Sequence, residues 1–256
     1  MDRGKVYSIL KALLDGLTEI APNWIKALIK FVSSLFKGLR GKRVIPHVLE
    51  PSLHNQTPPE PNFVGRAEML ATITEWYKNP KVRIGALIGW GGVGKSALMR
   101  KWFDSMSENG IRPDGIFWWG FYRNASLERF LEALLEYLAQ GRIDRTEIKS
   151  AWQRVEKIKE YILEGEYLLI LDGLEEMQKG ESGNELGRME HRELTELLHY
   201  LADAPALGLC LITTRYPLKD LDEWQERNYK PLSLIDLSIP DSLAMRKHSV
   251  KPSSLI

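Results

Sequence analysis

The chain has 256 residues, of which 44% are hydrophobic and 27% are charged. Its 35 basic and 34 acidic side chains nearly cancel, which argues against a protein that coats nucleic acid, and its hydrophobic content is too high for a mostly disordered chain. The single cysteine, Cys210, excludes an internal disulfide framework and a cysteine-rich zinc site. Length and composition therefore indicate one globular domain with room for an appendage, in a reducing compartment.

The first 43 residues are the basic part of the chain. They hold nine Lys and Arg against three Asp and Glu, so they carry +6 and leave −5 for the remainder. Within them, residues 24–39 combine a lysine and serine stripe at steps of three and four with a wide apolar face, which predicts a basic amphipathic helix. This helix suits packing on a second helix at 7–17, attachment to a membrane surface, or self-association and effector recruitment. No apolar run reaches the roughly 18 residues that a membrane span needs.

A proline-rich stretch follows this helix. Five of the 13 prolines fall within residues 41–61, among polar residues without periodicity. Proline removes a backbone donor and fixes φ, so this composition predicts an extended linker. We therefore divide the chain into a helical segment at 1–40, a linker at 41–61, a globular domain at 62–237 and an irregular tail at 238–256.

Helical and strand patterns alternate in the globular domain. Apolar periodicity predicts helices at 67–78, 97–106, 126–138, 146–164 and 192–202, and strands at 82–88, 115–122, 167–171 and 207–213. Ser126 is placed to cap the third helix, whose leucines and Phe130 share one face. Strands separated by helices predict a parallel sheet with helices on both faces.

The loop after the first of these strands matches a phosphate-binding pattern. The pattern G-x-x-x-x-G-K-[ST] fits Gly89-Trp90-Gly91-Gly92-Val93-Gly94-Lys95-Ser96, and Ala97 continues into the helix. Glycines let successive backbone N–H groups point at phosphate oxygens, and the helix aims its positive end at the same charge. We expect Lys95 to neutralise the β- and γ-phosphates and the Ser96 hydroxyl to bind Mg²⁺. This whole stretch, 89–97, is the predicted nucleotide-binding loop.

Polar residues end two later strands. Asp172 follows an apolar run at the carboxyl end of its strand, where parallel sheets place ligands, and we expect it to hold Mg²⁺ together with Ser96. Glu175 or Glu176, just beyond, could polarise an attacking water. The next strand ends in two threonines and Arg215, which we expect to contact the γ-phosphate.

These segments together resemble the STAND class of signal-transducing NTPases, which includes the NB-ARC and NACHT proteins. The resemblance covers roughly residues 61–237 and rests on five segments: Phe63-Val64-Gly65-Arg66 with Glu68, GGVGKS at 91–96, the aromatic strand at 115–122 with the helix at 126–138, LLILDGLEE at 168–176 and ITTR at 212–215. It implies an α/β P-loop NTPase fold with a parallel sheet flanked by helices, plus an N-terminal helical appendage. It also implies that Val64, Gly65 and Arg66 lie beside the nucleotide. The chain lacks a guanine-reading N-[KT]-x-D tetrad, which favours ATP and ADP over GTP.

The chain is shorter than the family's usual architecture. Members of the family continue past the sensor strand into a helical bundle and a winged helix, whereas the tail at 238–256 loses periodicity, so we expect a truncated or split switch ATPase. The predicted function is an ATP/ADP- and Mg²⁺-dependent switch with slow hydrolysis, cytoplasmic or peripheral to a membrane, in signalling or bacterial-type defence. Nucleic acid is not an expected partner. Two alternatives stay open: an AAA-like turnover ATPase, and a non-catalytic protein acting through its N-terminal helix on membranes or partners.

Overall fold

The computed structural model describes residues 48–61, 63–144, 148–180, 183, 185–204 and 208–234. The amphipathic helix predicted at 24–39 and the tail predicted at 238–256 lie outside these residues. In the described part, six strands form one sheet in the order β1-β3-β4-β5-β2-β6, and all five neighbouring pairs are parallel. The predicted α/β class with a parallel sheet is confirmed. The strands are β1 (Ser52–His54), β2 (Ile84–Ile88), β3 (Gly115–Gly120), β4 (Tyr167–Asp172), β5 (Leu209–Thr214) and β6 (Tyr229–Ser233).

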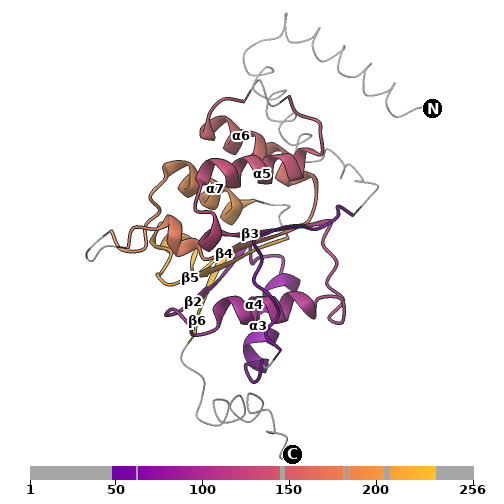
Figure 1. The fold of residues 1–256 in the computed structure, drawn as a ribbon, viewed down its shortest axis with the longest axis vertical. Helices are drawn as coiled ribbons and strands as arrows, with labels where there is room; N and C mark the ends of the chain where they lie inside the picture. The colour runs from indigo at the N-terminus through magenta and orange to yellow at the C-terminus, as the bar shows by residue number, and fades with distance from the viewer. Residues whose placement is uncertain are drawn as a thin grey trace, which may run out of the picture. The chain divides into compact units, whose positions relative to one another are not determined.

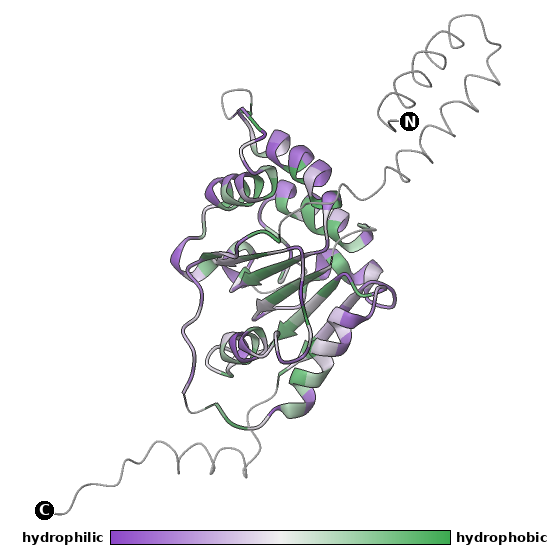
Figure 2. Ribbon diagram, turned by 90° about the vertical axis from the view of Figure 1, so that its right-hand side faces the viewer, coloured by the Kyte–Doolittle hydropathy of each residue, from purple (hydrophilic) through white to green (hydrophobic). Residues whose placement is uncertain are grey.

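Helices cover both faces of this sheet, as Figure 1 shows. On one face lie α5 (Leu127–Ala139), α6 (Ala151–Tyr161) and α7 (Arg192–Asp203), and on the other lie α3 (Ala67–Lys78) and α4 (Lys95–Asp104). Each helical layer packs against the sheet and forms a separate hydrophobic cluster with it. Every residue of β4 and of β5 is buried, which explains their nearly continuous apolar sequences, and the strands are the greenest elements of Figure 2.

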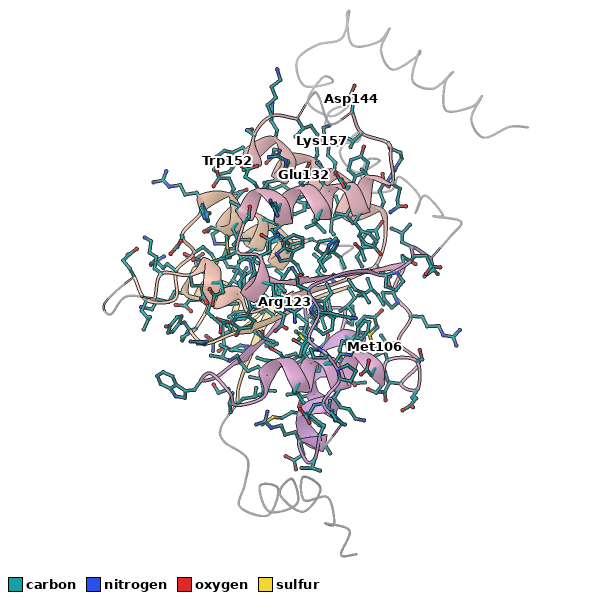
Figure 3. All side chains as sticks on the ribbon, viewed as in Figure 1. Met106, Arg123, Glu132, Asp144, Trp152 and Lys157 are labelled. Carbon is teal, nitrogen blue, oxygen red and sulfur yellow. The ribbon has the colours of Figure 1, made fainter. Side chains whose placement is uncertain are left out.

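Helix α6 begins later than its sequence pattern suggested. We predicted a helix over 146–164, but α6 starts at Ala151 because Ser150 and Gln153 form a capping box. The Ser150 hydroxyl accepts from the Gln153 N–H at 3.2 Å, and the Gln153 side chain accepts from the Ser150 N–H at 3.2 Å. These two bonds satisfy donors that a helix start leaves open. Figure 3 labels Trp152 and Lys157 of α6 and Glu132 of α5, which lie on the helical layer above the sheet.

The predicted linker contains a strand of the sheet. Assigning residues 52–54 to the linker is wrong, because they form β1 and pair in parallel with β3. The imidazole of His54 lies over that strand, with ring centroids 5.5 Å from Phe117 and 5.2 Å from Trp119. A three-residue strand between prolines has no periodicity to detect, and these aromatic contacts with distant residues fix it in place.

Other strand bounds also differ from the sequence reading: β2 begins at Ile84 rather than at 82, and β5 ends at Thr214 rather than at 213. Two larger differences concern β3 and β6. The aromatic strand predicted over 115–122 ends at Gly120, and a 3-10 turn, η1 (Phe121–Arg123), follows it at the carboxyl edge of the sheet. Strand β6 went unpredicted, since Pro231 lies within it. Proline is tolerated there because, among the described strands, β6 lies at the edge of the sheet and pairs with β2 alone. Across the described ranges, no helix is long and apolar enough to cross a bilayer.

Candidate functional site

The predicted phosphate loop connects β2 to α4 at the carboxyl edge of the sheet. Gly94 caps α4 in left-handed backbone, with φ at +85°, and no side chain caps this helix start. The turn into α4 therefore depends on the backbone freedom of glycine. The first N–H groups of α4 have no acceptors within the helix. Such a helix start, reached through a glycine turn, presents donors and a positive dipole to an anion.

Lys95 lies folded within this loop. Its side chain is buried, and its Nζ donates to the carbonyl oxygen of Gly89 at 2.7 Å and of Trp90 at 3.1 Å. Burial lowers the pKa of Lys95, and the nearby Glu175 carboxylate partly offsets that shift. The Lys95 ammonium therefore lies inside the loop. It has three N–H donors, and the two carbonyl oxygens accept from two of them.

Three hydroxyl groups converge on Asp172 at the end of β4. Ser96 Oγ and Thr213 Oγ1 both donate to Asp172 Oδ1 at 2.6 Å, and Thr57 Oγ1 donates to Oδ2 at 2.7 Å. The Gly173 N–H donates in turn to Thr213 Oγ1 at 2.8 Å. The predicted pair of Ser96 and Asp172 is thus in direct contact across 76 residues of sequence.

The acids beyond Asp172 point in different directions. A 3-10 helix, η4 (Leu174–Met177), turns Glu175 inward, where its side chain is 3% exposed, whereas Glu176 is exposed. Glu175 Oε1 accepts from the Tyr122 phenol and lies 2.9 Å from Arg215 Nε. Glu175 Oε2 is buried and has no hydrogen-bond partner among the described residues.

Two arginines flank the phosphate loop. Arg215 lies over Gly91, since a Cβ on that glycine would be 3.5 Å from Arg215 Cζ. The Glu175 carboxylate is the main cause of a raised pKa at Arg215. Arg66, at φ +62° just before α3, donates to the Val93 carbonyl, and its guanidinium is 3.2 Å from where a Gly94 Cβ would stand.

The structure brings most of the predicted site residues together. The loop at 89–97, Arg66, Asp172, Glu175 and Arg215 form one connected region, while Glu176 is turned to solvent and Val64 is half-buried before α3. Sequence reasoning missed Thr57, which lies in the predicted linker, and Tyr122, which we placed in a strand. Only their tertiary contacts reveal either residue.

The oxygen atoms around Asp172 fit a magnesium ion. A hydroxyl and a carboxylate are hard oxygen donors of the kind that Mg²⁺ prefers. The Asp172 side chain is buried and accepts three hydroxyl hydrogen bonds, and within the described residues it forms no ion pair with a lysine or arginine. A buried carboxylate without a directly paired cation is costly, which favours a metal there.

The central part of the chain matches a known protein family. Residues 66–181 match the NB-ARC domain family. An uncharacterized WD repeat-containing protein of Nostoc is 22% identical over 168 residues, which are 64% of this chain and 13% of that protein. The chain thus spans a small part of this curated relative's length.

Several solved structures align with part of the backbone. The Aeropyrum pernix ORC1 protein in complex with DNA is 15% identical with a TM-score of 0.48, covering 73% of this chain and 50% of that one. A Walker-type ATPase of Pyrococcus abyssi is 15% identical with a TM-score of 0.44, covering 78% of this chain and 60% of that one. Drosophila ORC bound to DNA is 20% identical with a TM-score of 0.47, covering 70% and 45%.

Proposed function

We propose that the domain around the phosphate loop, which matches the NB-ARC family over residues 66–181, binds ATP and ADP with Mg²⁺. In this proposal it acts as a slow, nucleotide-dependent switch in signalling or defence. The observation that carries the proposal is the junction of the loop with β4, where Ser96 Oγ lies 2.6 Å from Asp172 Oδ1 beside the buried Lys95. Phosphate and metal would be held together at this junction.

In this proposal, different residues of the site bind the phosphates and the metal ion. Backbone N–H groups at the start of α4 and the Lys95 ammonium bind the β- and γ-phosphates. Ser96 and Asp172 hold Mg²⁺, which when bound neutralises charge on the phosphate oxygens. Arg66, which packs on the loop backbone at Val93 and Gly94, supports the loop from the α3 side.

Hydrolysis is assigned to Glu175 rather than Glu176. Glu175 is buried at the site with Oε2 unpartnered among the described residues, whereas Glu176 is exposed. In the proposed step, water oxygen bonds to the γ-phosphorus while the bond from that phosphorus to the bridging oxygen breaks. The water's proton passes to Glu175 Oε2, and ADP leaves with the electron pair.

Arg215 supplies the switching element of this proposal. It is ion-paired with Glu175 at 2.9 Å and also lies over Gly91 of the phosphate loop. A γ-phosphate would compete with Glu175 for the same guanidinium, because both are anions that arginine binds through charged hydrogen bonds. ATP would therefore draw Arg215 from Glu175, and ADP would leave the ion pair intact. The two nucleotides would then favour two arrangements of the β5 end.

The output of the switch is assigned to the N-terminal segment. Its basic amphipathic pattern at 24–39 suits self-association, an effector or a membrane surface. The aligned stretch makes up only 13% of the length of the matching WD repeat-containing protein. That arrangement supports a role for such domains as one module of a larger protein.

Nucleotide binding by the full chain tests the proposal. We expect ADP and a non-hydrolysable ATP analogue to bind with Mg²⁺, and Lys95→Ala to lose at least tenfold in affinity. Lys101→Ala, which removes an exposed lysine of the same helix, is the matched control and should bind normally. No binding at millimolar nucleotide, or equal binding by both variants, would refute the proposal. Steady-state hydrolysis faster than about once per second would instead favour a turnover ATPase.

A further inference from the structure

Tyr122 lies where β3 ends against the acidic end of β4. It belongs to η1, and Figure 3 labels the neighbouring Arg123 at this edge. The Tyr122 phenol donates a hydrogen bond to Glu175 Oε1. Its ring covers the backbone of Gly173, because a Cβ there would stand 2.5 to 2.9 Å from three ring carbons. Tyr122 therefore contacts both the backbone next to Asp172 and the acid that follows it.

Both donors to Glu175 meet the same carboxylate oxygen. The phenol and Arg215 Nε share Oε1, and Oε2 has no hydrogen-bond partner among the described residues. A carboxylate without a hydrogen-bond donor turns about its terminal bond, since that torsion is broad. Donors on Oε1 restrict this rotation and leave the lone pairs of Oε2 available to accept a proton.

The phenol is suited to a permanent donor role. Burial first, and the hydrogen bond to Glu175 second, raise the pKa of Tyr122 above its usual value. The hydroxyl therefore stays protonated over the physiological range. Arg215 differs, because a γ-phosphate would draw it toward the loop, and Tyr122 would then be the donor that still holds Glu175.

We propose that Tyr122 is a positioning residue that holds Glu175 Oε1 so that Oε2 faces the attacking water. The inference rests on the proposed hydrolysis of ATP and adds to it the residue that orients the base. Tyr122 itself exchanges no proton with the substrate. Its effect is geometric: a misplaced base loses rate without a loss of nucleotide affinity.

The test removes the hydroxyl and keeps the ring. Tyr122→Phe in the full chain should lower the single-turnover rate of ATP hydrolysis about tenfold, because an incorrectly held base forfeits part of the 10²–10⁴ that general-base catalysis supplies. Its affinity for Mg²⁺–ADP should stay within about twofold of the parent, since the phosphate loop is untouched. Tyr200→Phe is the matched control, because its phenol donates to the Lys159 carbonyl at 3.0 Å on the α6–α7 layer. This control should leave both quantities unchanged.

A double-variant cycle separates positioning from mere packing. If Tyr122 acts through Glu175, then adding Tyr122→Phe to Glu175→Gln should cause no further loss of the residual rate. A further tenfold loss in that background, an unchanged rate in Tyr122→Phe, or a comparable loss of ADP affinity would each overturn the inference and leave the proposed function standing. Absence of any hydrolysis by the parent chain would instead refute the proposed catalysis itself, and this inference with it.

Discussion

A single methyl group at Gly173 tests the geometry on which these proposals depend. Gly173 has φ at +79°, and a Cβ there would lie 2.5 Å from Tyr122 Cε2. Gly110 offers a control with φ at +70° and nothing within 4 Å of its Cβ position. Alanine at either position is destabilised by the left-handed backbone conformation. Only at Gly173 must a side chain of the site also move.

The structure sets the expected size of the two effects. A Cβ in left-handed backbone costs about 1–2 kcal/mol, which is the whole expectation for Gly110→Ala. At Gly173 the tyrosine ring is displaced as well, and its charged hydrogen bond to Glu175 adds about 1–2 kcal/mol after allowance for the half-exposed ring. The total for Gly173→Ala is then about 2–4 kcal/mol, or a melting temperature lower by about 4–16 °C against about 2–8 °C for the control.

Thermal unfolding and single-turnover hydrolysis measure the two consequences separately. We expect Gly173→Ala to lose both stability and hydrolysis rate, and Gly110→Ala to lose stability alone. Equal stability of the two variants together with an unchanged hydrolysis rate in Gly173→Ala would show that the Tyr122 ring does not occupy this space. The reasoning about Glu175 would then fail with it.

Two further predictions concern Thr57 and Cys210. Thr57→Val should weaken Mg²⁺-dependent ATP binding several-fold, because Asp172 Oδ2 loses its donor at 2.7 Å, and Thr57→Ser should restore it; a loss of equal size without Mg²⁺ would contradict a role at the metal. Burial raises the pKa of the Cys210 thiol, so at pH 8 it should remain protonated and resist a disulfide labelling reagent until the chain is unfolded. Rapid labelling of the folded protein would show that the β5 core is open.

The sequence alone was enough to locate the elements whose patterns are local. Apolar runs of the right length predicted β4 and β5, and Ser126 predicted the start of α5, where its hydroxyl accepts from the Arg129 N–H. The phosphate loop was visible for the same reason, since its glycines meet backbone requirements within eight residues. Patterns of this kind need no knowledge of the rest of the chain.

Contacts between distant segments decided the remainder. The hydrogen bond from Thr57 to Asp172 spans 115 residues and the one from Tyr122 to Glu175 spans 53, and no periodicity links either pair. The sequence also could not distinguish the roles of Glu175 and Glu176. Adjacent glutamates are chemically equivalent, and only the fold of η4 buries one and exposes the other.

Composition and motif determined that this chain holds a phosphate loop on a parallel sheet. The tertiary structure alone decided which side chains complete the site, because parallel strands from distant parts of the chain end at one edge. Strand order sets those neighbours: β5 lies between β4 and β2, so Arg215 can reach both Glu175 and the loop. That order depends on packing summed over the whole domain, which no short segment encodes.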